Sequence, residues 1–553
     1  MIGVITVLAR LVGFGRQVVF AHTVGTTCLG TAYTTANMVP NIIYDIVLGG
    51  ALASVVVPVL AGPAGRAAQG PAARQIASAL LTWTVVLLVP VSAVVALAAH
   101  PIVSVLLSDA SGCPRADLAG VGTRMLIVFA PQVLLYGLAV VLYGILQSHR
   151  RFGAPALAPL LSSLVVVGAY AGFGAVGGAY VNRLHSLPPM AEYLLSGGTT
   201  LGVLAFVLTA VVPAWRLGIG MRPTLRFPAG VGPRVRRLAI AGVLTLVAQD
   251  ASVAVVIVLA NRYGDPGALV IYGFAWAVFV VPYAVLAVPI ATSTFPELSA
   301  TSGVARPDPD SAGGESSAPG TAAAGDVRAP GGAPDGEFDR TAAASTRAVM
   351  LAGWLGAAAL AGARLPLARV FESHATPAAS VLAVALAAFA PGLIGYGLSA
   401  NLSRVLYARG RNRAPALAMS AGWVLVIAAD LLIVPFVPRS RVVPALGAGT
   451  SIGLTVAGVA LLVLVRRERG GAALAGVARA FLAGLAGCAA GAAAGSAISA
   501  LIPAHGFFPN VGVSVLVSAA VTAVFAAVVM NLDGGDLRTA LRRLRTRVPA
   551  VEP

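Results

Sequence analysis

The sequence predicts an all-α polytopic membrane protein with about 14 transmembrane helices, arranged as two parallel six-helix lobes plus two extra C-terminal helices. Three observations predict this fold class. Of the 553 residues, 58% are hydrophobic and only 10% are charged, which is too little charge for a water-facing surface. Apolar windows of about 20 residues, the length that crosses about 30 Å of hydrocarbon, recur along the chain. The sequence also contains an internal repeat.

Fourteen apolar windows are long enough to cross a membrane. They lie near residues 4–24, 31–61, 75–99, 119–147, 155–178, 195–214, 237–260, 268–296, 346–365, 376–407, 414–437, 443–465, 473–502 and 510–531. Several contain a proline, which removes a backbone hydrogen bond and kinks the helix. The first window begins close to Met1 without a basic n-region or a convincing cleavage site, so we expect no cleavable signal peptide.

The internal repeat appears when the chain is aligned with itself at an offset of 260 residues. Residues 129–158 and 389–418 are identical at 14 of 30 positions without a gap. The two copies lie six windows apart, so they cross the membrane in the same direction. This pattern is typical of two parallel lobes related by an axis along the membrane normal, with the substrate path between them.

The windows and the repeat together set the expected domain boundaries. The C-lobe is interrupted at 299–345, where Ser, Gly, Ala, Pro and seven acids replace large apolar side chains, a composition typical of a disordered linker. The expected parts are the N-lobe 1–214, a basic cytoplasmic loop 215–236, the C-lobe 237–465, two final helices 466–531 and a basic cytoplasmic tail 532–553. Leucines and arginines on separate faces of the tail predict an interfacial helix that contacts anionic membrane lipids. Gly487, Gly491 and Gly495 predict a smooth face for close helix packing in the thirteenth helix.

Arginine placement predicts the orientation in the membrane. With the amino terminus inside, the inner loops and tail hold 26 arginines and the outer loops hold 7. Since basic residues accumulate on the cytoplasmic side, both termini are expected to be cytoplasmic.

Several functional classes are excluded by what the chain lacks. All 37 basic residues are arginine, so there is no Walker-A lysine or Schiff-base lysine. The GxSxG match at 449–453 opens a membrane helix without a preceding strand, and no HExxH occurs. We therefore expect no enzyme activity, cofactor, metal site or nucleic-acid partner.

The three cysteines leave a question open. Cys28, Cys113 and Cys488 match no metal-binding spacing. Cys28 and Cys113 both fall in predicted outer loops, where they can form a disulfide or remain two unrelated thiols. We favour two unrelated thiols.

Polar side chains inside the first two windows mark the candidate site. Asn37, Asn41 and Asp45 recur every four residues and share one helix face, and Arg10 and Arg16 lie in the preceding window. A charge at bilayer depth costs roughly 2.5–3.5 kcal/mol on insertion scales, so such groups face a bundle interior or a wet cavity. The alternative is that Asp45 neutralises an arginine to hold two helices together. The further candidates are Asp250, Arg404 and Asp430, as ion-binding or cavity residues. His22 is interpreted as a solvated histidine near the outer end of the first helix.

The same stretch resembles the opening of the MurJ/MviN lipid II flippase family, of the MOP/MATE-like exporter superfamily. The resemblance rests on Arg10-Leu-Val-Gly-Phe-Gly-Arg16, Val39-Pro-Asn41, Gly49-Gly-Ala-Leu52 and Val57-Pro58, and resumes at Ala275–Val288 and Phe295–Ser299. It implies fourteen helices in the bacterial cytoplasmic membrane and a central cationic cavity that binds the pyrophosphate of an undecaprenyl-linked peptidoglycan precursor. It further implies that the lipid tail runs along a groove formed with the last two helices, and that Arg10 and Arg16 match two family arginines.

This chain departs from the family pattern at several charged positions. The family commonly has an acid directly after the second arginine and another at the start of the second helix, where this chain has Gln17 and Thr31. In place of an arginine pair near the middle of the second helix and the acid after it, this chain has Tyr44-Asp45 and Gly49. In place of an arginine on the eighth helix it has Ala277. We therefore expect the cavity of this chain to carry fewer positive charges than the cavity that the family pattern predicts.

The leading hypothesis is a flippase that moves lipid II outward by alternating access for cell-wall synthesis. It would be driven by the membrane potential or by an ion, without ATP. One alternative is a flippase for another polyprenyl-linked saccharide, or a MATE-like drug/cation antiporter in which Asp45, Asp250 and Asp430 bind the cation. Another is a scaffold that recruits cell-wall synthesis enzymes through the linker and the tail.

Overall fold

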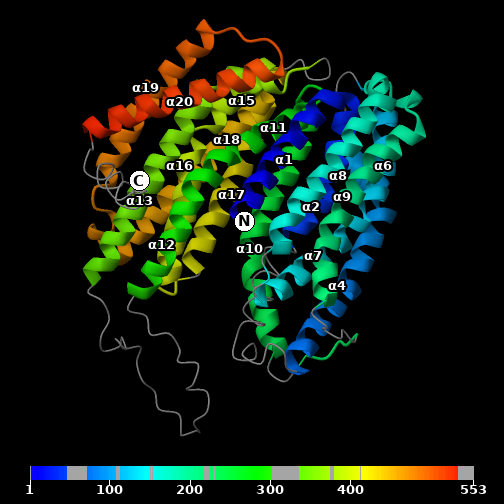
Figure 1. The fold of residues 1–553 in the computed structure, drawn as a ribbon, viewed down its shortest axis with the longest axis horizontal. Coiled ribbons are helices and arrows are strands. Elements are labelled where there is room, and N and C mark those ends of the chain that lie inside the picture. Colours follow the sequence, from blue (N-terminus) through cyan, green and yellow to red (C-terminus); the bar gives the residue numbers. More distant parts are fainter. Residues whose placement is uncertain are drawn as a thin grey trace, which may run out of the picture. The chain divides into compact units, whose positions relative to one another are not determined.

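The described part of the protein is built from long helices (Figure 1). The computed structural model describes residues 2–46, 71–107, 113–149, 151, 153–216, 223–227, 231–301, 335–373, 379–411 and 413–532. Within these residues, 11 helices are long and apolar enough to cross a membrane, or up to 12 if the bent pair Ala379–Phe389 and Gly392–Ala408 forms one span. The predicted all-α polytopic class is confirmed, whereas the count of fourteen stays a prediction.

Several predicted features lie outside the described residues. These are the motifs Gly49-Gly-Ala-Leu52 and Val57-Pro58, positions 302–334 of the expected linker, much of the expected basic loop, and all but the first residue of the expected tail.

The chain divides into two compact units. Unit 1 comprises Met1–Ala277, Ala368–Leu382 and Ile427–Leu446, and unit 2 comprises Val278–Leu367, Ala383–Val426 and Gly447–Pro553. The helices that begin in unit 1 are α1 (Ile2–Thr23), α2 (Cys28–Asp45), α4 (Pro71–Leu97), α5 (Ala99–Leu106), α6 (Arg115–Phe129), α7 (Pro131–Ser148), α8 (Gly153–Gly177), α9 (Pro189–Arg216), α10 (Val231–Tyr263), α11 (Ala268–Pro282) and α15 (Ala379–Phe389). Those that begin in unit 2 are α12 (Val288–Thr301), α13 (Asp335–Gly362), α14 (Arg364–Val370), α16 (Gly392–Ala408), α17 (Arg413–Ile433), α19 (Val477–Leu501) and α20 (Phe507–Leu532), and α18 (Val442–Arg469) begins in unit 1 and continues into unit 2.

Unit 1 packs around its first two helices. The chain leaves α1 through Gly25, whose φ of 64° lies in the left-handed region that glycine adopts without steric cost. Thr27 then caps α2, because its side chain accepts a hydrogen bond from the Gly30 N–H. α1 packs on α8, α8 on α9, and α2 on α6 and α7. Phe129 and Phe173 are fully buried in this core.

The two repeat copies share a local structure. In the first copy α6 ends at Phe129 and α7 begins at Pro131, and in the second α15 ends at Phe389 and α16 begins at Gly392. The shared Phe-Ala-Pro sequence explains the break, because proline supplies no N–H to continue the preceding helix but fits at the start of the next. The repeat therefore encodes a broken helix in both copies.

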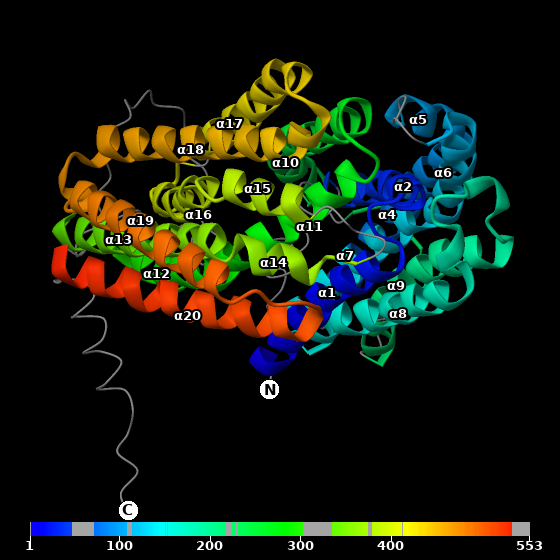
Figure 2. The same cartoon turned by 90° about the horizontal axis from the view of Figure 1, so that it is seen from above.

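The glycine face predicted in α19 is confirmed within unit 2. Gly487, Gly491 and Gly495 are buried, and α19 packs on α13 and α20, which lie beside it in both views (Figure 2). A Cβ atom at Gly495 would lie 2.7 Å from Val521 Cγ2 and 2.9 Å from Gly362 Cα. Only glycine allows this approach without a shift of the neighbouring helices.

Helix α13 begins inside the segment expected to be a linker. It starts at Asp335, and its first turns are held by side-chain contacts. Phe338 is fully buried, the Arg469 guanidinium lies 5.4 Å from its ring centroid, and Arg469 Nε donates to Asp339 Oδ1 at 2.8 Å. Three of the acids that suggested disorder, Asp335, Glu337 and Asp339, are thus part of a folded helix, because one apolar side chain and one ion pair fix this end.

Candidate functional site

A polar cavity of about 220 Å³ lies inside unit 1, lined by residues of α1, α2, α7, α8, α9 and α11. α1 supplies Arg16 and Gln17, and α2 supplies Thr34, Asn37 and Asn41. Thr34, Asn37 and Asn41 are spaced by three and four residues, so they share one face of α2. Asn37 and Asn41 of the predicted polar stripe therefore line the cavity, whereas Asp45 does not.

Arg16 is the charged member of the described lining. Within the described part of the chain no carboxylate forms an ion pair with it. An arginine in a partly buried position retains its charge, and its guanidinium presents five N–H donors in a fixed fork. The cavity therefore offers a cation together with neutral hydrogen-bonding groups.

A hydroxyl network forms one wall of the cavity. The Tyr33 hydroxyl lies 2.8 Å from the Tyr170 hydroxyl and 2.8 Å from Thr199 Oγ1. The Phe20 ring packs against both tyrosines, with centroid distances of 5.2 Å. Since these groups are buried and satisfied, they fix α2 against α8 and α9 and hold the wall in one arrangement.

An amide and a phenol form a second wall. The Tyr136 hydroxyl donates to Asn41 Oδ1 at 3.3 Å, and Asn41 Nδ2 donates to the Asn37 carbonyl at 2.9 Å. The Tyr136 ring packs on Tyr44, with centroids 4.3 Å apart. Tyr44 therefore orients Tyr136 from outside the lining, and Tyr136 orients Asn41.

The second repeat copy carries a matching aromatic pair in unit 2. Tyr396 is the residue 260 positions after Tyr136, and its ring stacks on Tyr283 at 4.0 Å. Each copy therefore presents a tyrosine that packs on a second tyrosine.

The other candidates predicted from sequence lie outside this cavity lining. Arg10 is exposed on α1, six residues before Arg16. Asp45 is half-buried at the end of α2, and no ion pair joins it to an arginine in the described part of the chain. The alternative that Asp45 neutralises an arginine to hold two helices together therefore has no support among the described residues.

The remaining candidates are dispersed. Asp250 on α10 and Asp430 on α17 are buried, and neither carboxylate has a hydrogen-bond partner among the described residues. Arg404 on α16 is half-buried and donates to the Ala400 carbonyl at 2.6 Å. His22 is exposed in the last turn of α1, and it lines a second cavity of about 480 Å³ with Asn182.

The preference for unrelated thiols at Cys28 and Cys113 is wrong. The two residues form a disulfide across 85 positions of sequence. α2 packs on α6, and this contact brings the start of α2 to the segment that precedes α6. The sequence places both thiols in loops but does not say which loops meet.

The sequence of this chain matches a known protein family. The chain matches the family described as "Lipid II flippase MurJ" over residues 20–517, which is most of its length. The chain belongs to the MurJ family.

Individual relatives of this MurJ-family chain are distant. It is 26% identical over 231 residues to a "Probable lipid II flippase MurJ" of Synechocystis sp., covering 41% of each chain. It is 27% identical over 309 residues to the "Lipid II flippase MurJ" of Burkholderia cenocepacia, covering 53% of this chain and 55% of that one. The matched regions thus span about half the length of these relatives.

Solved structures agree on the fold. The structure described as "Lipid II flippase MurJ, inward closed conformation" aligns with a TM-score of 0.69 at 16% identity, covering 96% of this chain and 98% of that one. An inward-facing multidrug resistance MATE family transporter of the MOP superfamily aligns with a TM-score of 0.61 at 14% identity, covering 84% and 94%. At these identities the likeness concerns the fold alone.

Sequence reasoning missed the phenols that line the cavity of this MurJ-family chain. Tyr33 precedes Asn37 by four residues, so extending the predicted stripe by one turn would have found it. Tyr136 lies in the Tyr-Gly-Leu motif shared by the repeat copies. Tyr170 and Thr199 carry no such signal, since their role depends on hydrogen bonds that Tyr33 of α2 makes to α8 and α9.

Proposed function

We propose that this protein moves a lipid-linked peptidoglycan precursor, lipid II, across the bacterial cytoplasmic membrane by alternating access. It acts as a transporter and not as an enzyme. The observation that carries the proposal is Arg16, a cation without a carboxylate partner among the described residues, in a polar cavity inside a membrane-spanning fold. An unneutralised charge at this depth is costly unless a ligand or water compensates it.

The chemistry of the cavity fits the polar part of such a substrate. The Arg16 fork matches the oxygens of a diphosphate. The neighbouring amides and phenols, including Asn37, Asn41 and Tyr136, match sugar hydroxyl groups, which both donate and accept hydrogen bonds. The volume of about 220 Å³ is below the roughly 300–1,000 Å³ of typical ligand pockets. The cavity therefore takes a diphosphate with an adjoining sugar ring, and the lipid tail stays outside.

The proposed membrane architecture has fourteen helices in two six-helix lobes, with the boundaries predicted from sequence except that the linker lies between α12 and the start of α13 at Asp335. Both termini are cytoplasmic. The excess of arginine in the inner loops and the shared broken helix of the two repeat copies support this arrangement.

Energy for transport is proposed to come from an ion or from the membrane potential. Asp250 and Asp430 are buried carboxylates without hydrogen-bond partners among the described residues, and a bound cation would compensate them. One elementary charge crossing the membrane is worth about 2.3 kcal/mol per 100 mV. Arg10, which is exposed on α1, Asp45 and Arg404 are proposed to contact the substrate or the ion at other stages of the cycle.

Complementation tests the proposal most directly. The full chain is expressed in a bacterium depleted of its own lipid II flippase, and growth and intracellular precursor are measured. Wild type should restore growth and prevent accumulation of the precursor, and Arg16→Ala should not. If the folded wild-type chain leaves the precursor inside the cell, lipid II is the wrong substrate.

A second candidate function is cation-coupled export of drugs, as suggested by the fold shared with a MATE transporter and by the buried carboxylates. The same assay separates the two. An antiporter requires that Asp45→Asn abolish transport while Arg10→Ala and Arg16→Ala do not. A flippase for another polyprenyl-linked saccharide would retain the arginine requirement but fail to rescue lipid II export.

Cell-wall synthesis enzymes are proposed partners of the linker and the tail. Deleting 303–342 tests this role, although the deletion also removes the first turns of α13. A matched deletion of 303–333 leaves α13 intact. A transporter should tolerate the shorter deletion, whereas a scaffold should lose its function.

A further inference from the structure

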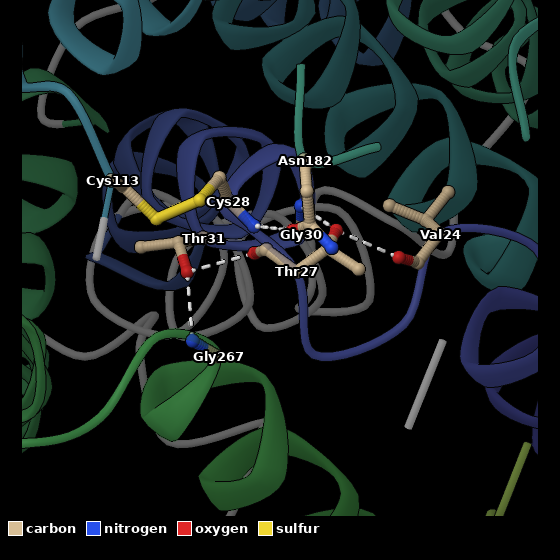
Figure 3. Close-up of a disulfide and its surroundings, with 8 residues drawn as sticks. All are labelled: Val24, Thr27, Cys28, Gly30, Thr31, Cys113, Asn182 and Gly267. Atoms are coloured by element: carbon tan, nitrogen blue, oxygen red, sulfur yellow. Dashed lines mark hydrogen bonds between the residues drawn. A yellow bond between two sulfur atoms is a disulfide. The ribbon is translucent and has the colours of Figure 1, made fainter. Parts of the chain in front are cut away.

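Four segments far apart in the sequence meet at the start of α2 (Figure 3). The disulfide joins Cys28 to Cys113, in the segment before α6. The Cys28 N–H donates to Asn182 Oδ1 at 3.1 Å, and the Leu29 N–H donates to the Val181 carbonyl at 3.0 Å. These bonds satisfy two of the backbone donors that the first turn of a helix leaves unpaired.

A third segment reaches the same turn from the start of α11. The Gly267 N–H donates to Thr31 Oγ1 at 2.9 Å, and Thr31 Oγ1 donates to the Thr27 carbonyl at 3.0 Å. Gly267 has a φ of 80°, and a Cβ atom there would lie 2.5 Å from Thr26. A close approach of this kind requires glycine. We call Cys28, Thr31, Cys113, Asn182 and Gly267 the α2 anchor.

One more contact supports the anchor one turn farther along α2. Asn261 Nδ2, from α10, donates to Thr35 Oγ1 at 3.0 Å and to the Leu106 carbonyl at 2.9 Å. Asn261 thus connects α2 with the end of α5 through two hydrogen bonds. The segment that contains Cys113 follows α5 in the chain. The disulfide is therefore the covalent member of a network that already holds the same parts together.

Chain order places all these segments on one side of the membrane. They connect predicted spans 1 and 2, 3 and 4, 5 and 6, and 7 and 8, and a chain that crosses at every span has these connections on the same side. With the amino terminus cytoplasmic, that side is the outside. Disulfides persist outside the cell and are rare in the cytosol.

We propose that Cys28 and Cys113 are a modification site, oxidised on the outer face of the membrane by a thiol–disulfide oxidoreductase, and that this bond secures the outer end of unit 1. The proposal rests on the proposed orientation and not on the identity of the substrate. Cys28 is 4% exposed and Cys113 is 9% exposed, so the finished bond is shielded from other thiols. We infer that oxidation precedes the final packing of these segments.

The oxidation is a thiol–disulfide exchange in two steps. One cysteine thiolate attacks the disulfide of the oxidoreductase, forming a mixed disulfide and releasing the first thiolate of the donor. The second cysteine thiolate attacks the mixed disulfide, forming the Cys28–Cys113 bond and releasing the second thiolate of the donor. The chain loses two electrons and two protons, and the donor becomes a dithiol.

Thiol counting on the full chain tests the modification. Membranes are dissolved in denaturant with a maleimide-linked polyethylene glycol, with and without prior reduction. Wild type should gain one adduct before reduction and three after it, and Cys488→Ser, which removes the free thiol of α19, should gain none and two. Three adducts on unreduced wild type would overturn the proposal.

A carboxyl-terminal reporter that is active only in the cytoplasm separates this proposal from the orientation. An oxidised pair with an active reporter supports both. Free thiols with an active reporter overturn the disulfide while the orientation stands. An inactive reporter overturns the topological argument, whatever the state of the thiols.

The structural role is tested by thermal unfolding and hydrogen exchange of the purified protein. In Cys28→Ser/Cys113→Ser, or in wild type reduced under mild denaturation and alkylated, the peptide covering 26–34 should exchange about tenfold faster and the Tm should fall by several degrees. Exchange in α19 and α20 should not change. If both samples match oxidised wild type in exchange and Tm, the bond does not secure this end.

Discussion

Replacing Arg16 with Gln should weaken binding of an undecaprenyl diphosphate without unfolding the protein. The substitution removes the cation of the cavity and leaves a neutral side chain beside Gln17. A hydrogen bond to a charged group contributes about 1.5–3 kcal/mol. Since about 1.4 kcal/mol corresponds to a factor of ten, the Kd should rise about 10-fold to 150-fold. Arg16→Lys retains the charge but not the fork, so an intermediate loss is expected.

Equilibrium binding in detergent micelles, with undecaprenyl pyrophosphate as ligand, measures this effect. The matched control is Arg74→Gln, which removes an exposed arginine of α4 outside the cavity lining and should leave the Kd within about twofold. Arg10→Gln shows whether the site extends along α1. If Arg16→Gln keeps the Tm and the affinity of wild type, the cavity is not the phosphate site and the proposed function loses its main support.

Three further variants test separate contacts. Tyr136→Phe keeps the aromatic packing but removes the hydroxyl that holds Asn41, so the affinity for a sugar-bearing lipid should fall by about 0.5–1.5 kcal/mol, while that for the sugarless diphosphate is unchanged. Gly495→Val should lower stability by about 1–3 kcal/mol through overpacking, measured by thermal unfolding, and Gly512→Val, with open space around its Cβ position, should cost less. Asp339→Asn should lower stability more than Glu468→Ala, because Asp339 forms a largely buried ion pair with Arg469, whereas Glu468 belongs to an exposed pair worth about 0–1 kcal/mol. Equal Tm values within either matched pair would contradict the packing argument for that pair.

The sequence could predict the features that depend on local spacing. Membrane helices follow from apolar length, and the glycine face of α19 follows from a four-residue spacing. The polar stripe of α2 is of the same kind, because Asn37 and Asn41 share a helix face whatever surrounds them. Arg16 could be placed in a cavity because an unpaired charge in an apolar helix leaves few alternatives.

The features that were missed depend on which helices pack together. Tyr170 and Thr199 contribute to the cavity because their side chains on α8 and α9 reach Tyr33 of α2, and nothing in their own segments indicates this. The error at Cys28 and Cys113 has the same cause, since a disulfide across 85 positions depends on the contact between α2 and α6. The start of α13 was obscured for a different reason. Its composition is typical of disorder, but one buried phenylalanine and one ion pair suffice to order it.

One departure from the family pattern, Tyr44-Asp45, affects the side chains that line the cavity. Where the resemblance led us to expect an arginine pair, this chain has Tyr44-Asp45, and Tyr44 packs on Tyr136, which in turn holds Asn41. The exchange replaces two cations with a phenol and a carboxylate, so it removes attraction for phosphate, and Tyr44 helps to orient the Tyr136 phenol and, through it, the Asn41 amide. On the proposed function, a site with one arginine would gain less binding energy from the diphosphate that all polyprenyl-linked saccharides share. Its selectivity among such lipids must therefore come from the neutral groups, and the ratio of affinities for sugar-bearing and sugarless lipids should fall in Tyr136→Phe but stay constant in Arg16→Gln.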